Sequence, residues 1–88
     1  MNVIHPTTFA ALADPTRLRI IEMLSDRGEL SASQISGEFS MSAPAVSQHL
    51  KVLREAGLVH MQKRAQQRIY QLDAKTLAQL EHWLHRRA

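Results

Sequence analysis

Cysteine is absent from this 88-residue sequence, and that absence excludes several kinds of chemistry at once. Without thiols the chain has no disulfide, no thiolate zinc site, no thiol redox sensor and no cysteine nucleophile. Glycine and proline are scarce, with three of each, which argues against a disordered or loop-dominated chain. We therefore expect one folded domain over residues 1–88.

Long apolar runs are also missing. No stretch approaches the roughly 20 apolar residues of a membrane span. Residues 1–6 have neither the basic start nor the apolar run of a secretion signal. A cytoplasmic protein without a membrane partner is the expectation.

Positive charge is present and is concentrated in one part of the chain. The formal net charge is +3, which favours a polyanionic partner but does not by itself select nucleic acid. Between residues 42 and 72, however, five basic side chains stand against one acidic one, Glu55. The basic residues are Lys51, Arg54, Lys63, Arg64 and Arg68.

Apolar spacing and capping residues predict a mainly helical fold with a small β-hairpin, in the order α-α-α-α-β-β-α. Asp14 and Asp73 are expected to cap helices, and Leu18, Ile21 and Leu24 to form the buried face of the second helix. The predicted helices cover 9–12, 15–25, a short segment capped by Ser31 or Ser33, 43–56 and 74–87, and the strands cover 58–63 and 68–72.

The helix over 43–56 carries the strongest functional signal. Its apolar residues fall on one side, whereas Ser47, Gln48 and Lys51 face outward. Glutamine can bind adenine with two hydrogen bonds, and lysine can reach guanine or a phosphate. Two helices, a tight turn and a basic hairpin predict a winged helix-turn-helix. An amphipathic surface helix has the same pattern, so the helix alone leaves that alternative open.

The hairpin over 58–72 has a cationic tip, 63–68, suited to phosphates or a minor groove, although a solvated turn looks similar. Because the tip lacks glycine, we expect a longer or more mobile connection than a two-residue turn. The candidate DNA-binding residues are Ser42, Pro44, Ser47, Gln48, His49, Lys51, Lys63, Arg64, Gln66, Gln67 and Arg68.

Two blocks of sequence, Ala11 to Ile20 and Pro44 to Val59, resemble the signature segments of ArsR/SmtB-type winged-helix repressors. The second block is specific because it joins recognition helix, C-cap and first wing strand without interruption. The resemblance implies a homodimer that binds an imperfect inverted repeat and represses by blocking polymerase. It also implies a dimer seam between the first and last helices, although the same apolar residues could instead cover the monomer core. The candidate interface residues are Phe9, Leu12, Leu77, Leu80, Trp83 and Leu84.

The metal-sensing motifs of that family are incomplete here. Ser31 and Ser33 stand where the thiol-dependent sensors have a pair of cysteines, and hydroxyls do not replace thiolates toward a soft ion. The zinc-sensing branch uses the last helix, where this chain has Lys75 in place of a histidine. His82 and His85 remain candidate ligands without a complete set, so no cofactor is expected.

The metal-free repressor has three alternatives. One is a zinc-responsive repressor that uses the last-helix histidines, and another is a winged-helix module that binds a protein. An enzyme is not expected, because Ser47 and His49 are two residues apart on a helix and do not face each other. The sequence identifies no effector.

Overall fold

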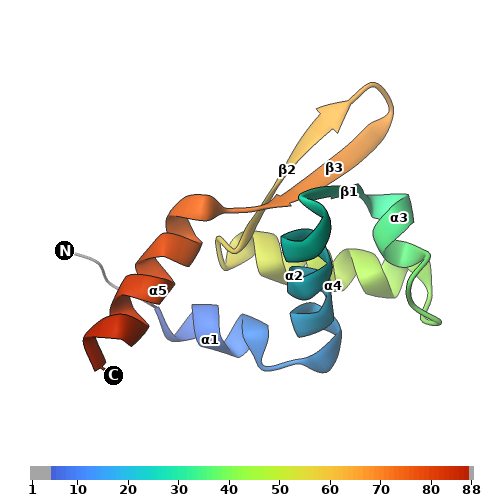
Figure 1. Cartoon of the computed structure of the whole chain (residues 1–88). Helices are drawn as coiled ribbons and strands as arrows, with labels where there is room; N and C mark the ends of the chain where they lie inside the picture. The colour runs from blue at the N-terminus through green and yellow to red at the C-terminus, as the bar shows by residue number, and fades with distance from the viewer. Residues whose placement is uncertain (1–4, 88) are drawn as a thin grey trace.

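A computed structural model describes residues 5–87 of the chain. The expectation that the chain has no secretion signal concerns residues 1–6, and residues 1–4 of that segment lie outside the described range. Figure 1 shows a helical body with a projecting β-hairpin. The elements are α1 (Pro6–Leu12), α2 (Pro15–Arg27), β1 (Glu29–Ser31), α3 (Ala32–Ser36), α4 (Ala43–Glu55), β2 (Val59–Arg64), β3 (Gln67–Leu72) and α5 (Ala74–Arg87).

Side-chain caps start four of the helices, and three of these caps are predicted from the sequence, at Asp14, at Asp73 and at Ser31 or Ser33. Asp14 accepts a hydrogen bond from the Arg17 N–H at 3.0 Å, and Asp73 accepts one from the Thr76 N–H at 2.9 Å. Ser31, rather than Ser33, caps α3, and it forms a capping box with Gln34. Ser42 caps α4. These bonds satisfy N–H groups that have no partner within their own helix.

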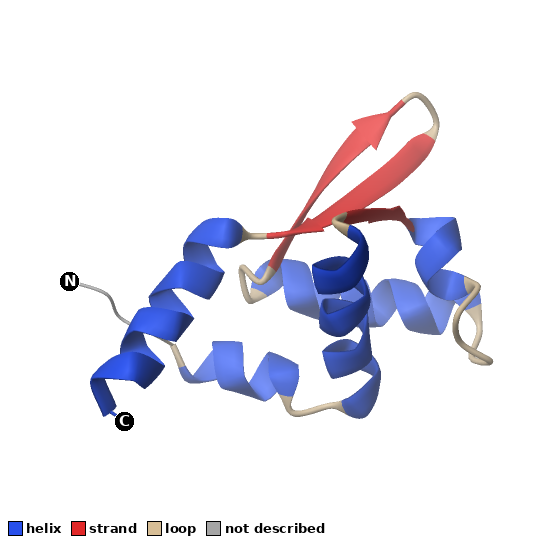
Figure 2. Ribbon diagram, viewed as in Figure 1, coloured by secondary structure: helices blue, strands red, loops and turns tan. Residues whose placement is uncertain are grey.

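The sheet has one strand more than expected. β1 pairs antiparallel with β3, which pairs antiparallel with β2, so the strand order is β1-β3-β2 (Figure 2). In this register Leu30 lies opposite Tyr70. With three residues, β1 is too short to show a period-two pattern in the sequence. The expected class, mainly helical with a winged helix-turn-helix, is otherwise confirmed.

The hairpin turn contradicts the expectation of a longer tip. Arg64 pairs with Gln67, so only Ala65 and Gln66 connect the strands. Ala65 adopts a φ of 57°, which supplies the positive φ that a two-residue primed turn needs at its first position. The left-handed region costs an L-residue roughly 1–2 kcal/mol. The strand pairing on either side offsets that cost.

The core lies among α2, α3, α4 and the sheet. Its fully buried side chains include Ile20, Met23, Leu50 and Leu53. The predicted face of α2 is confirmed at Leu24, which is buried, and Ile21 is partly buried against the core. The prediction is wrong at Leu18, which is 46% exposed, whereas Ile20 is buried. α5 differs from the other long helices in having no buried residue among its 14. In Figure 1, α5 stands apart from α3 and α4, at the end of the molecule where α1 begins.

None of the helices within residues 5–87 is long and apolar enough to cross a membrane.

Candidate nucleic-acid interface

Helix α4 presents one apolar and one polar face. Val46, Leu50 and Leu53 are buried against the core, which fixes the rotation of the helix. The same rotation exposes Ser47, Gln48 and Lys51 to solvent, together with Pro44 in the first turn. The Ser42 hydroxyl accepts a hydrogen bond from the Ala45 N–H at 3.3 Å, so Ser42 acts as the N-cap of this helix. The structure therefore brings the predicted outward residues of α4 together on one surface.

A polar concavity of about 400 Å³ joins this surface to the hairpin. It is lined by Ser47, Gln48, Lys51, Arg54, Glu55, Arg68 and Tyr70. Sequence reasoning did not include Arg54 or Tyr70 among the site residues. Arg54 follows Lys51 by three positions, a spacing that places both on one side of a helix and could have identified it. Tyr70 gave no such signal, because an aromatic residue in a strand is typical of the core, and the residue is only 4% exposed.

The hairpin tip extends beyond the helices (Figures 1 and 2). Lys63, Gln66, Gln67 and Arg68 are exposed there, as the sequence predicts for residues that reach a nucleic-acid backbone. Arg68 also borders a second concavity of about 460 Å³ between α3, α4 and β3. The surface between α4 and the hairpin is therefore continuous, and it carries basic residues from both elements.

Arg64 differs from the other basic residues of the hairpin. Its guanidinium donates two hydrogen bonds to the Glu29 carboxylate, at 2.7 and 3.2 Å, and Gln71 donates a third to the same group at 2.9 Å. The Arg64 hydrogen bonds hold the pKa of Glu29 below its usual range and raise the pKa of Arg64. This ion pair links β2 to β1 across β3, so Arg64 is already engaged within the domain.

His49 also makes contacts within the domain. Its Nδ1 lies 3.2 Å from Arg17 Nη1 and 3.8 Å from Asp14 Oδ2. Arginine has no acceptor, so at 3.2 Å Arg17 donates and Nδ1 accepts. The Asp14 pKa is lowered, chiefly because its carboxylate accepts the Arg17 backbone N–H. The His49 side chain is 24% exposed, so the structure separates it from the fully outward residues of α4.

The candidate residues of the dimer interface lie on α1 and α5. Phe9 and Trp83 pack with ring centroids 5.3 Å apart, and the Arg87 guanidinium lies 4.1 Å above the Trp83 ring. Leu84 is 51% exposed and Phe9 is 38% exposed. The remaining three are partly buried: Leu12, Leu77 and Leu80.

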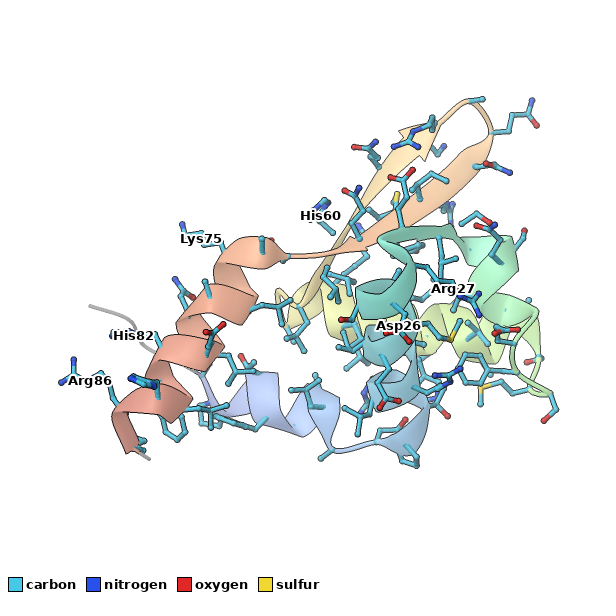
Figure 3. All side chains as sticks on the ribbon, viewed as in Figure 1. Asp26, Arg27, His60, Lys75, His82 and Arg86 are labelled. Carbon is cyan, nitrogen blue, oxygen red and sulfur yellow. The ribbon has the colours of Figure 1, made fainter. Side chains whose placement is uncertain are left out.

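The last-helix histidines, His82 and His85, are exposed on α5. Figure 3 shows His82, Lys75 and Arg86 directed away from the rest of the domain. His85 and Glu81 line a shallow pocket with His82. Between residues 5 and 87, no group of three or more His, Cys, Asp or Glu side chains is arranged to hold a metal ion.

Taken together, a helix that exposes polar and basic side chains beside a basic hairpin defines a winged helix-turn-helix DNA-binding protein. Residues 14–61, more than half of the chain, match the family described as bacterial regulatory protein, arsR family. The chain belongs to this arsR family.

Known relatives agree with this assignment. The chain is 46% identical over 76 residues to the HTH-type transcriptional regulator Rv2034 of Mycobacterium tuberculosis, a match that covers 86% of this chain and 70% of that protein. It is 32% identical over 76 residues to the transcriptional repressor SdpR of Bacillus subtilis, covering 86% and 83%. Its structure matches that of HlyU from Vibrio cholerae with a TM-score of 0.74 and 41% identity, covering 91% and 86%.

The family and these relatives are transcriptional regulators rather than enzymes, as the sequence predicts. The chain is therefore a DNA-binding transcriptional regulator.

Proposed function

We propose that this protein is a homodimeric repressor that binds an inverted-repeat operator in promoter DNA in the cytoplasm. The observation that carries the proposal is the continuous polar and basic surface formed by the outer face of α4 and the hairpin. A B-DNA major groove, about 12 Å wide, admits an α-helix. In this arrangement α4 enters the major groove while the hairpin follows the adjacent backbone.

Gln48 is the main sequence-reading residue in this proposal. It is exposed on α4 and carries both a donor and an acceptor, which match N7 and the N6 amino group of adenine. Ser47 lies beside it and can donate or accept. Lys51, one turn further along the helix, reaches a guanine or a phosphate.

The hairpin supplies contacts that position the protein without reading sequence. Lys63 and Arg68 are exposed cations, and Gln66 and Gln67 are exposed amides at the tip. Such side chains bind phosphate and sugar oxygens or enter a minor groove. Their loss should weaken binding to all DNA sequences by a similar factor.

The proposed dimer forms through α1 and α5. One face of α5 is an open, mostly apolar surface lined by Leu77, Leu80, Glu81, Leu84 and His85. A helix with no buried residue gains little from packing within its own monomer, so a second copy of the same face gives it a core. Phe9 of α1 continues this apolar surface through its contact with Trp83.

Repression follows if the bound dimer occupies the site that polymerase needs. Among the relatives, SdpR is named a transcriptional repressor and HlyU a transcriptional activator. A promoter–reporter fusion decides between these outcomes. Repression requires reporter output to rise when the regulator gene is deleted, and a fall in output would establish activation instead.

A selection from random-sequence duplexes tests the DNA-binding proposal. The wild-type protein should enrich an inverted repeat with half-sites about one helical turn apart, and bind it as two protomers per duplex. The Lys51→Gln variant should bind this duplex more weakly, whereas Lys75→Gln, which removes the same charge from α5, should bind it as the wild type does. Enrichment of no sequence, or equal losses in both variants, would contradict the proposal.

A further inference from the structure

We propose that Asp14, Arg17 and His49 form a positioning cluster that sets the direction of α4 relative to α1. The inference deepens the proposed function and rests on it, because α1 belongs to the proposed dimer seam and α4 to the proposed reading surface. In a dimer, the direction of α4 from the seam determines how far apart the two reading helices lie. The cluster would therefore select the half-site spacing that the protein accepts.

Arg17 is the centre of the cluster because it bonds to both helices. Its Nε donates to the Ala11 carbonyl at 2.7 Å, and its Nη2 donates to the Ala10 carbonyl at 3.4 Å. Both carbonyls belong to the last turn of α1, and the Ala10 carbonyl also accepts the backbone N–H of Ala13 at 3.2 Å. The remaining nitrogen, Nη1, reaches His49 on α4 at 3.2 Å. One guanidinium thus connects the end of α1 to the reading helix.

Asp14 holds the backbone of Arg17 in place. Its carboxylate caps α2 by accepting the Arg17 backbone N–H, and the same oxygen lies 3.8 Å from His49 Nδ1. The backbone of Arg17 is therefore anchored while its side chain spans the gap between α1 and α4. The planar fork of arginine suits this role, since it presents several donors in a fixed geometry.

Apolar contacts alone do not fix the direction of α4 relative to α1, so polar groups can determine it. α2 packs against both α1 and α4. Yet Ala11 is the one apolar residue of α1 in the buried core of the described chain. Leu12 adds a partly buried contact with the core, but a helix of only seven residues with these two contacts is weakly oriented by packing. Directional hydrogen bonds at its last turn then determine how it is held.

Three substitutions test the cluster without removing the α2 cap. Arg17→Gln removes the guanidinium but keeps the backbone N–H that Asp14 binds. His49→Leu removes the acceptor, whereas His49→Asn keeps an acceptor near the position of Nδ1. Arg19→Gln is the matched control, because Arg19 is exposed on the same helix and its loss lowers the charge equally.

The measurement is the ratio of affinities for two duplexes. One is the duplex that the wild-type protein enriches from a random library, and the other contains one or two additional central base pairs. Arg17→Gln and His49→Leu should reduce the wild-type preference between them by about tenfold, the scale of a hydrogen bond to a charged group. His49→Asn and Arg19→Gln should retain the preference. Because α1 belongs to the proposed seam, the ratio is measured at protein concentrations where every variant is dimeric, so that a weaker dimer does not enter it.

Two results would overturn the inference, and they are distinguishable. If Arg17→Gln and His49→Leu keep the wild-type spacing preference and lose only thermal stability, the cluster holds the fold together and does not position α4. If the wild-type protein itself is monomeric or shows no spacing preference, the proposed function fails, and this inference fails with it. Comparing His49→Leu with His49→Asn keeps the test decisive even if Arg17→Gln folds poorly.

Discussion

The salt dependence of DNA binding measures how many basic residues of this surface meet phosphates. Four basic residues in each protomer lie on α4 or the hairpin and have no ion pair within residues 5–87: Lys51, Arg54, Lys63 and Arg68. Arg64 is held by Glu29. A dimer then offers about eight cations, and each neutralised phosphate contributes a slope of about −0.9, so log K should fall against log salt with a slope of about −7.

The magnitude is large enough to measure directly. Between about 0.05 and 0.2 M salt, a slope of −7 weakens binding by roughly four orders of magnitude. Fluorescence anisotropy with a labelled duplex gives the slope for each variant. Arg68→Gln should make the slope shallower by about 2, because the dimer loses two contacts, whereas Arg64→Gln should change it much less. A wild-type slope shallower than about −4, or equal effects of the two substitutions, would refute this account of the surface.

Three further predictions concern the dimer, the hairpin turn and the Glu29 carboxylate. Leu84→Glu should give a monomer in sedimentation equilibrium at concentrations where the wild type is dimeric, because it places a charge on the apolar face of α5; a persistent dimer would exclude this seam. Ala65→Gly should raise the free energy of unfolding by about 0.5 kcal/mol in urea, since relief of the positive φ exceeds the entropy cost of glycine; a lower free energy would show that Ala65 is unstrained. The pKa of Glu29 is lowered from about 4.5, so its ionised form stabilises the fold above that pH and the contribution is lost as the pH falls through the lowered pKa. The difference in Tm between the wild type and Glu29→Gln should therefore be constant near neutral pH and vanish in acid, and a difference that does not change with pH would contradict the ion pair.

Local sequence signals were sufficient for most of the fold. The capping roles of Asp14 and Asp73 depend on residues three positions away, and both are confirmed. Gly57 follows the C-cap of α4 with a φ of 75°, and the Leu58 N–H bonds back to the Leu53 carbonyl, which is a local way to end a helix. Such features depend on neighbouring residues, which a sequence displays directly.

Features that depend on tertiary contacts were not predictable in the same way. Leu18 and Ile20 are both apolar, and only the packing of α2 against α4 and β3 decides which is buried. The tip of the hairpin was wrongly expected to be long, because the pairing of Arg64 with Gln67 overrides the conformational preference of Ala65.

In the candidate site, too, some features follow from local sequence and others depend on tertiary contacts. The outward face of α4 follows from helical spacing and was predicted from the sequence. The ion pair of Arg64 with Glu29 and the hydrogen bond of His49 with Arg17 join residues 35 and 32 positions apart. No local pattern distinguishes these side chains from their unpaired neighbours on the same elements. The sequence therefore identifies the surface but not which of its side chains are already engaged.

The most direct test of the central claim is a scan of every single base-pair change in the enriched duplex, with wild-type protein and Gln48→Ala. If α4 reads the major groove through Gln48, the variant should bind the original duplex about 1–3 kcal/mol more weakly and lose discrimination at one base pair in each half-site, while keeping it elsewhere. Equal weakening on every duplex, with discrimination unchanged at all positions, would contradict the claim that this helix reads the sequence.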